Sequence, residues 1–238
     1  MTELLKIIQQ RQSLRMPFDN QRPVPKEALL QILEAARWTP TAHNMQNFEI
    51  VVVDDKKQIE AISAIPRPIS EVFIRENYHQ LSFSEEELMK KKTGLLGTMF
   101  PPEWLNPDFK FDNKAESDLA VQRSLPACSL LLVVVYDPSK RAPASEGDFL
   151  GIISLGCAME NMWLMANSLG IGFHIVSSLS AVESEKEVKE ILNIPKHLKM
   201  AFTCRLGYPL ATPSKSLRVR RDINDFASHN IYGNKDLE

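Results

Sequence analysis

The most constraining feature of this 238-residue chain is an apolar stretch that runs from residue 149 to residue 173. About 20 such residues are enough to cross a bilayer, so the stretch has the length of a membrane span. Glu160 and Asn161 interrupt it, and such side chains would be costly against lipid. Its apolar residues recur at near-helical spacing, and Gly170 is placed to end a helix. We therefore predict a helix over about residues 148–169, buried in a core or a subunit interface and not in a membrane.

Four other runs have the character of strands. Residues 48–53 and 130–136 are short, rich in β-branched side chains and followed by aspartate, which is typical of buried strands. Residues 200–206 alternate between large apolar and smaller or polar side chains, which predicts a strand with one wetter face. Residues 171–179 are a candidate fourth strand.

Helices are expected around these strands. Apolar residues at helical spacing predict one over residues 3–12 and another that starts near Pro25 and ends between Arg37 and Pro40. A capping-box pattern from Ser84 predicts a third over about residues 85–96.

Residues 66–118 differ in composition from the rest of the chain. They are rich in proline and charge, and they predict an inserted, partly helical lid. Phe100, Trp104 and Phe109 could stack flat substrates, or could form a small satellite core. No repeat or low-complexity linker divides the chain, so we expect one domain over residues 1–238.

Charge and cysteine content exclude several classes of partner. A formal net charge of −2 and a pI near 6.2 give no basic footprint for nucleic acid or an anionic membrane. Cys128, Cys157 and Cys204 are far apart and lie in apolar runs, so we expect buried free thiols in a reducing compartment. The first residues lack the apolar core of a signal peptide, and a cytoplasmic location is expected.

The motifs of several enzyme classes are missing from the sequence. It contains no Gly-x-Gly-x-x-Gly, Walker loop, His-Glu-x-x-His or Gly-x-Ser-x-Gly, so dehydrogenases of Rossmann type, nucleotide hydrolases, zinc proteases and esterases lack support. The five histidines show no metal-ligand spacing, and we expect no metal site.

Two clusters of basic residues stand near the ends of the chain. One is Arg11-Gln-Ser-Leu-Arg15 and the other is Arg218-Val-Arg-Arg221. Forked guanidinium donors and a hydroxyl are what an anionic phosphate requires. Spacing alone favours the alternative, in which both clusters are solvated surface charge.

Several linked blocks resemble the signature of the nitroreductase family. Arg11-Gln-Ser-Leu-Arg15 is followed by Pro23-Val-Pro-Lys-Glu27, by Glu34-Ala-Ala-Arg37, and by Pro40-Thr-Ala-His-Asn-Met-Gln46. Asn161 to Gly172 and Leu206-Gly-Tyr-Pro209 are similar to later blocks of the family. Thr41 stands where the family usually has serine and keeps the hydroxyl, whereas Asn47-Phe48 replaces the family's Pro-Trp.

The resemblance implies an α+β fold, a three-layer α-β-α sandwich with a central mixed or antiparallel sheet flanked by helices. It also implies a homodimer that exchanges its C-terminal segments and binds flavin mononucleotide (FMN) at the interface. The implied activity is an oxidoreductase that moves electrons from NADH or NADPH through flavin N5 to a small aromatic, quinone-like or nitro substrate by a ping-pong mechanism. The chemistry belongs to the flavin, so no catalytic side chain is expected.

The resemblance also assigns residues to the cofactor. The segment Arg11, Gln12, Ser13 and Arg15 would contact the phosphate and the pyrimidine edge of the flavin, and Arg218 and Arg220 would complete the phosphate site. From the other subunit, Pro40, Thr41, Ala42 and Asn44 would line the cofactor. Ile175, Val176, Ser177 and Ser178 would run beside the isoalloxazine, where a backbone N–H could hydrogen-bond N5. The alternatives are a carboxylate partner for Arg15, a turn role for Asn44, and ordinary strand positions for Ser177 and Ser178.

Other functions stay open from the sequence. The same fold could serve a specialised flavin enzyme, such as a dehalogenase, an ene-reductase or a flavin-fragmenting oxygenase. The chain could also be a non-catalytic protein that stores or senses FMN, or an interaction module without a cofactor. Neither the physiological oxidant nor the choice between NADH and NADPH is evident from the residues.

Overall fold

The computed structural model describes most of the chain, in the ranges 1–67, 72, 75–99, 125, 127–145, 147–212 and 217–236. The chain divides into two compact units, residues 1–67 with 117–213 and residues 68–116 with 214–238. The expectation of one domain with a lid at 66–118 stays a prediction. The three aromatic residues proposed for the lid, Phe100, Trp104 and Phe109, lie outside the described residues.

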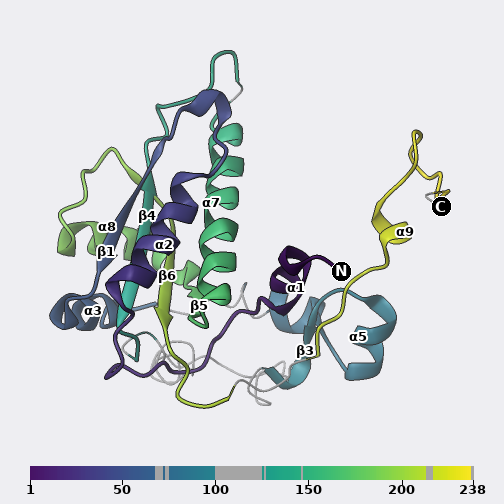
Figure 1. Ribbon diagram of the computed structural model, residues 1–238, viewed down its shortest axis with the longest axis horizontal. Coiled ribbons are helices and arrows are strands. Elements are labelled where there is room, and N and C mark those ends of the chain that lie inside the picture. The colour runs from purple at the N-terminus through teal and green to yellow at the C-terminus, as the bar shows by residue number, and fades with distance from the viewer. Residues whose placement is uncertain are drawn as a thin grey trace. The chain divides into compact units, whose positions relative to one another are not determined.

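A four-stranded antiparallel sheet forms the centre of the first unit (Figure 1). Its order is β1-β4-β6-β5, with bounds Phe48–Val53 for β1, Leu130–Tyr136 for β4, Lys199–Gly207 for β6 and Gly172–Ile175 for β5. The strands predicted at 48–53 and 130–136 have the observed bounds. The fourth candidate, 171–179, is a strand only over its first part.

Helices cover both faces of this sheet. Every residue of β4 is buried, and alternate side chains face opposite layers. Leu131, Val133 and Val135 belong to the same core as α3 (Lys56–Ser63) and α8 (Val182–Ile191). The neighbouring side chains of β4 pack with α2 (Lys26–Arg37) and α7 (Phe149–Ser168), which lie along one face of the strands in Figure 1. The predicted α+β architecture of three layers is confirmed.

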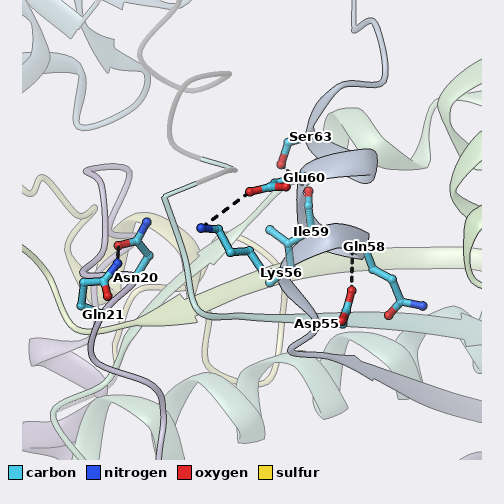
Figure 2. A network of polar contacts seen from close by, with 8 residues as sticks. All are labelled: Asn20, Gln21, Asp55, Lys56, Gln58, Ile59, Glu60 and Ser63. Atoms are coloured by element: carbon cyan, nitrogen blue, oxygen red, sulfur yellow. Dashed lines mark hydrogen bonds and ion pairs between the residues drawn. The ribbon is translucent and has the colours of Figure 1, made fainter.

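Local sequence explains where the first helices begin. Helix α1 (Glu3–Gln10) starts after Thr2, whose hydroxyl accepts a hydrogen bond from the backbone N–H of Leu5. Helix α3 starts after Asp55, whose Oδ1 accepts from the N–H of Gln58 at 2.9 Å (Figure 2). The sequence pattern does not predict α3 or α8.

The prediction that one face of the strand at 200–206 is exposed to solvent is wrong. Thr203 and Arg205, which should point to solvent in that interpretation, are both 0% exposed. The reason is topological, because β6 lies between β4 and β5 and has helices over both of its faces. Arg205 is thus a charged side chain inside the core.

The second unit is smaller. Helix α5 (Glu85–Lys91) begins with the predicted capping box from Ser84 but ends earlier than residue 96, because Lys92 takes a left-handed conformation with φ 53°. Strands β2 (Ser82–Phe83) and β3 (Leu95–Leu96) pair in parallel. Lys92 forms an ion pair with Asp222, just before the short helix α9 (Ile223–Phe226). A π-helical turn spans Arg75–Gln80 and a 3-10 turn spans Gly97–Met99.

Helix α7 is the one helix in the described ranges that is long and apolar enough to cross a membrane by length and composition. In the most apolar 18-residue stretch of α7 the mean hydropathy is 1.4, and 33% of the residues of this stretch are buried within the chain. Within the described residues, several apolar side chains of α7 therefore remain exposed.

Candidate functional site

The segment from Arg11 to Phe18 runs in an extended path beside β5 and β6. Helix α1 ends before this segment, because Arg11 has a non-helical backbone with φ −54° and ψ 130°. The backbone N–H of Leu14 donates to the carbonyl of Phe173 at 3.1 Å, and that of Phe18 donates to Ala127 at 2.9 Å. The segment is therefore anchored to the edge strand β5 at Leu14 and to the residues that precede β4 at Phe18.

Arg205 holds the middle of this segment. Its Nη2 donates to the backbone carbonyl of Leu14 at 2.9 Å and to that of Met16 at 2.7 Å. Its Nε donates to Nδ1 of His174, its cross-strand neighbour on β5, at 2.9 Å. The guanidinium also lies over the ring of Phe18, 4.3 Å from the centroid. Burial lowers the pKa of Arg205 to about 10, so the group stays charged at neutral pH.

Phe18 fits against the sheet because two facing residues of β5 and β6 are glycines. A Cβ on Gly172 would lie 2.6 Å from Cε1 of Phe18, and one on Gly207 would lie 2.8 Å from Cβ of Phe18. Gly172 and Gly207 are partners in the strand register. The two glycines thus make room for the ring that ends the segment.

The two arginines of the segment have different surroundings. Nε of Arg11 lies 3.0 Å from Oε1 of Glu160, and the guanidinium stacks on the ring of Trp163 at 4.3 Å from the centroid. Arg15 has an exposed side chain, although desolvation still lowers the pKa of its guanidinium. Within the described ranges, neither Arg15 nor the hydroxyl of Ser13 has a hydrogen-bond or ion-pair partner. The carboxylate partner considered for Arg15 is thus found on Arg11 instead.

The loop predicted to line a flavin has an unusual backbone. His43, Asn44 and Gln46 have φ of 51°, 52° and 44°, a left-handed region that non-glycine residues seldom adopt. Part of this loop is a 3-10 turn, Ala42–Asn44, and the hydroxyl of Thr41 accepts from the backbone N–H of Gln46 at 3.2 Å. Such strain persists only where the surroundings enforce it, and it is frequent at functional sites.

Polar side chains of α7 hold both segments in place. Oγ of Ser154 accepts from the N–H of Ala42 at 3.4 Å, and Nδ2 of Asn161 donates to the hydroxyl of Thr39 at 3.2 Å. Further along, Nε1 of Trp163 donates to the carbonyl of Gln12 at 3.3 Å. The polar interruptions noted in the sequence are therefore anchors for two loops.

The stretch after β5 is the third predicted contact. The N–H of Val176 donates to the carbonyl of Thr203 at 2.8 Å, which extends the pairing with β6 by one residue beyond Ile175. Ser177 and Ser178 are exposed and begin a 3-10 turn, Ser177–Ser180. The first N–H groups of a helical turn have no partner within that turn, so they can serve an outside acceptor.

The remaining residues predicted to contact the cofactor are exposed. Pro40 is exposed at the start of the strained loop. Arg218 and Arg220 belong to the second unit, where both are exposed in an extended stretch, and Nη1 of Arg220 donates to the carbonyl of Val219 at 2.6 Å. Their meeting with Arg11 and Arg15 at one phosphate stays a prediction.

A cavity of about 180 Å³ lies beside the strained loop, lined by Gln46, Asn47, Glu49, Tyr136 and His197 among others. Sites for ligands of cofactor size commonly measure about 300–1,000 Å³. The cavity is therefore too small to hold a flavin, and neither the Arg11 segment nor Ile175 to Ser178 lines it.

The described geometry can be compared with known proteins. The model of the nitroreductase family matches residues 8–208, most of the chain. The chain belongs to the nitroreductase family. Among similar proteins, one from Archaeoglobus fulgidus, provisionally named an NADH dehydrogenase/NAD(P)H nitroreductase, is 25% identical over 209 residues, which cover 88% of this chain and 87% of that protein. An NADPH-dependent oxidoreductase from Staphylococcus haemolyticus is 22% identical, over 89% of this chain and 68% of its own length.

Solved structures of the family agree with the fold. A nitroreductase with bound FMN from Bacteroides fragilis superposes with a TM-score of 0.56 at 19% identity, covering 91% of this chain and 95% of its own. Family membership confirms the predicted oxidoreductase class. Arg205 and His174 are not predicted from the sequence, since no motif marks them and a polar residue in an alternating strand is ordinarily assigned to the solvent side.

Proposed function

We propose that this member of the nitroreductase family is an FMN-dependent oxidoreductase that works as a homodimer. The observation that carries the proposal is the anchored Arg11 segment. Its backbone is fixed by hydrogen bonds to Phe173, Ala127 and Arg205, whereas the Arg15 guanidinium and the Ser13 hydroxyl have no partner in the described part of the chain. A rigid backbone that presents unused donors is suited to an anionic, hydrogen-bonding ligand.

The donor set fits FMN. Arg11 and Ser13 supply a guanidinium and a hydroxyl for the phosphate, and Arg218 and Arg220 are proposed to complete that site. Glu160 already faces Arg11 at 3.0 Å, so it would share or orient this guanidinium when a phosphate binds. Arg15 is proposed to face the pyrimidine edge, near N1 and O2 of the flavin.

The residues have simple roles in the proposed reaction. When bound, FMN supplies the transfer of hydride and electrons at N5 between a nicotinamide and the oxidised substrate. Arg15 would stabilise negative charge at the pyrimidine edge. The backbone N–H of Ser177 or Ser178 would donate to N5, with Ile175 and Val176 beside the ring. No acid or base side chain is required for these steps.

The homodimer is proposed from surfaces that the chain leaves uncovered. On α7, Phe149, Ile152 and Ile153 are 66%, 50% and 47% exposed. Apolar exposure on this scale along one helix indicates a protein partner. A second copy is the occupant we propose, and it would cover α7.

Both loops that are proposed to contact flavins are held by α7, the helix of the proposed interface. Ser154 contacts Ala42 and Trp163 contacts Gln12, and these helix positions are nine residues apart. At 1.5 Å per residue the two contacts are separated by about 14 Å along the axis. We propose that Pro40, Thr41, Ala42 and Asn44 line the flavin of the other subunit.

The donor and the substrate class complete the proposal. NADH or NADPH would reduce the flavin and leave, and a small aromatic, quinone-like or nitro compound would then take the electrons at the same face, a ping-pong sequence. The test is an absorption spectrum of the purified protein, followed by anaerobic addition of NADH and of NADPH. A yellow protein that bleaches supports the proposal, a yellow protein that does not bleach indicates FMN storage or sensing, and a colourless protein that binds no added FMN refutes it.

A further inference from the structure

We propose that Arg205 is a positioning residue for Arg15, and that its buried guanidinium sets the place of the Arg15 side chain at the flavin. This inference rests on the proposed FMN site. Leu14 and Met16 are the residues on either side of Arg15, and Nη2 of Arg205 holds the carbonyls of both, at 2.9 and 2.7 Å. The backbone that carries Arg15 is thus fixed from both sides by one nitrogen atom.

The same guanidinium ties this segment to strand β5. Nε of Arg205 donates to Nδ1 of His174, and His174 precedes the stretch Ile175 to Ser178 that is proposed to run beside the isoalloxazine. Because Nδ1 accepts this hydrogen bond, the neutral imidazole carries its proton on Nε2. Arg205 therefore connects the two segments of one chain that are proposed to meet the same flavin.

The cost of burying Arg205 supports a positional role. The side chain is 0% exposed, and taking a charge out of water is unfavourable unless several good hydrogen bonds compensate for it. An apolar side chain of similar size is often tolerated at least as well at such a place. Arginine is distinctive because its rigid fork of donors can hold two carbonyls and an imidazole at once.

The experiment compares Arg205→Met with Arg15→Ala and with the double variant. Methionine keeps an unbranched apolar side chain but removes every donor. We expect Arg205→Met to raise the Kd for FMN about tenfold, as loss of a buried charged hydrogen-bond donor implies, and to make the reduction potential of the bound flavin more negative. The part of this effect that acts through Arg15 is already lost in Arg15→Ala, so the double variant should lose less affinity than the sum of the two single losses.

Arg22→Met is the matched control. Arg22 is exposed and stacks on the ring of Tyr208, 3.5 Å from the centroid, so this variant also removes an arginine from an aromatic face. It should change neither the Kd nor the potential. Circular dichroism at the assay temperature establishes that each variant is folded.

The outcomes separate this inference from the proposed function. If the wild-type protein binds no FMN, the proposed function fails first. If the wild type binds FMN and Arg15→Ala weakens binding, while folded Arg205→Met keeps the wild-type Kd and potential, Arg205 does not position Arg15. A lower melting temperature with an unchanged flavin potential, or fully additive losses in the double variant, would also overturn the inference and leave a structural role.

Arg205→Lys covers the case in which Arg205→Met does not fold. Lysine keeps the buried charge, but its single ammonium lacks the fork that reaches both carbonyls and the imidazole. We expect its FMN Kd to rise about threefold or more, with the potential shifted in the same direction. A folded Arg205→Lys protein with wild-type affinity and potential would refute the positioning role.

Discussion

Acidification should destabilise this protein through His174 before most carboxylates are protonated. The imidazole is 4% exposed, and its Nδ1 accepts a hydrogen bond from Arg205. Burial, followed by the positive charges of Arg205 and Arg15, lowers the pKa of His174 from 6.5 to about 3. The folded protein therefore keeps this histidine neutral at pH values where the unfolded chain protonates it.

The sign and size follow from proton linkage. Between pH 6.5 and about 3 the unfolded state binds more protons at this site than the folded state, so the free energy of unfolding falls as the pH falls through this window. At pH 5 the imidazole of the folded protein is almost wholly neutral, so the loss of stability comes from protonation of His174 in the unfolded chain. The free energy of unfolding at pH 5 is therefore roughly 2 kcal/mol lower than at pH 8.

Urea denaturation of the wild type and of His174→Asn at pH 8 and pH 5 measures this effect. Asparagine offers an oxygen acceptor to Arg205 but does not titrate. Between pH 8 and pH 5 the free energy of unfolding of the variant should fall by about 2 kcal/mol less than that of the wild type.

His229→Asn, at an exposed histidine, is the control, and its stability should change with pH as that of the wild type does. Protein concentration and flavin occupancy are kept equal, since both shift apparent stability. Equal pH dependence in the wild type and His174→Asn would refute the reasoning.

Three further predictions concern the cofactor, the core and the interface. Arg15→Ala should raise the FMN Kd about tenfold and make the flavin potential more negative, because a positive charge leaves the pyrimidine edge; a titration showing unchanged values would remove Arg15 from the site. Gly172→Ala should lower the free energy of unfolding by about 1–3 kcal/mol, because the new Cβ would lie 2.6 Å from Phe18. Gly97→Ala, where the nearest atom is 3.6 Å away, is its control in urea denaturation. Ile153→Asp should convert a dimer to monomers in size-exclusion chromatography with light scattering, and an unchanged mass would contradict the proposed interface.

Buried strands were the most predictable part of the fold. Residues 48–53 and 130–136 are short apolar runs rich in β-branched residues and closed by aspartate. The prediction of a buried strand is confirmed for β4, whereas β1 is an edge strand in which only Val53 is buried. The sequence did not predict helix α3 because charged and polar residues together make up most of it, although Ile59 and Ile62 are both buried at a spacing of three. That spacing was the available signal.

Arg205 shows where sequence reasoning fails in physical terms. An arginine that alternates with Cys204 and Leu206 is ordinarily assigned to the solvent side of a strand, because burying a charge is costly. The compensation comes from the carbonyls of Leu14 and Met16, about 190 residues away in the sequence, and no local pattern indicates that contact. The motif from Arg11 to Arg15 could be identified in the sequence, but the hydrogen bonds from Arg205 that hold this segment could not.

Helix α7 is apolar enough to enter a membrane, but its polar side chains indicate a protein environment. Its apolar length alone is compatible with a lipid environment, and within one chain 33% of its most apolar window is buried. Its polar groups decide between the environments, because Ser154, Asn161 and Trp163 are engaged by backbone and side-chain groups of two loops that flank the helix. Loops at that depth in a bilayer would leave backbone groups unsatisfied, whereas a second copy of the chain can cover the apolar residues and leave the loops in contact with water and ligand. A second copy packed on α7 would contact the same helix that binds Ala42 and Gln12. Weakening the contact between the two copies should therefore weaken flavin binding by both the Arg11 segment and the Pro40–Asn44 loop.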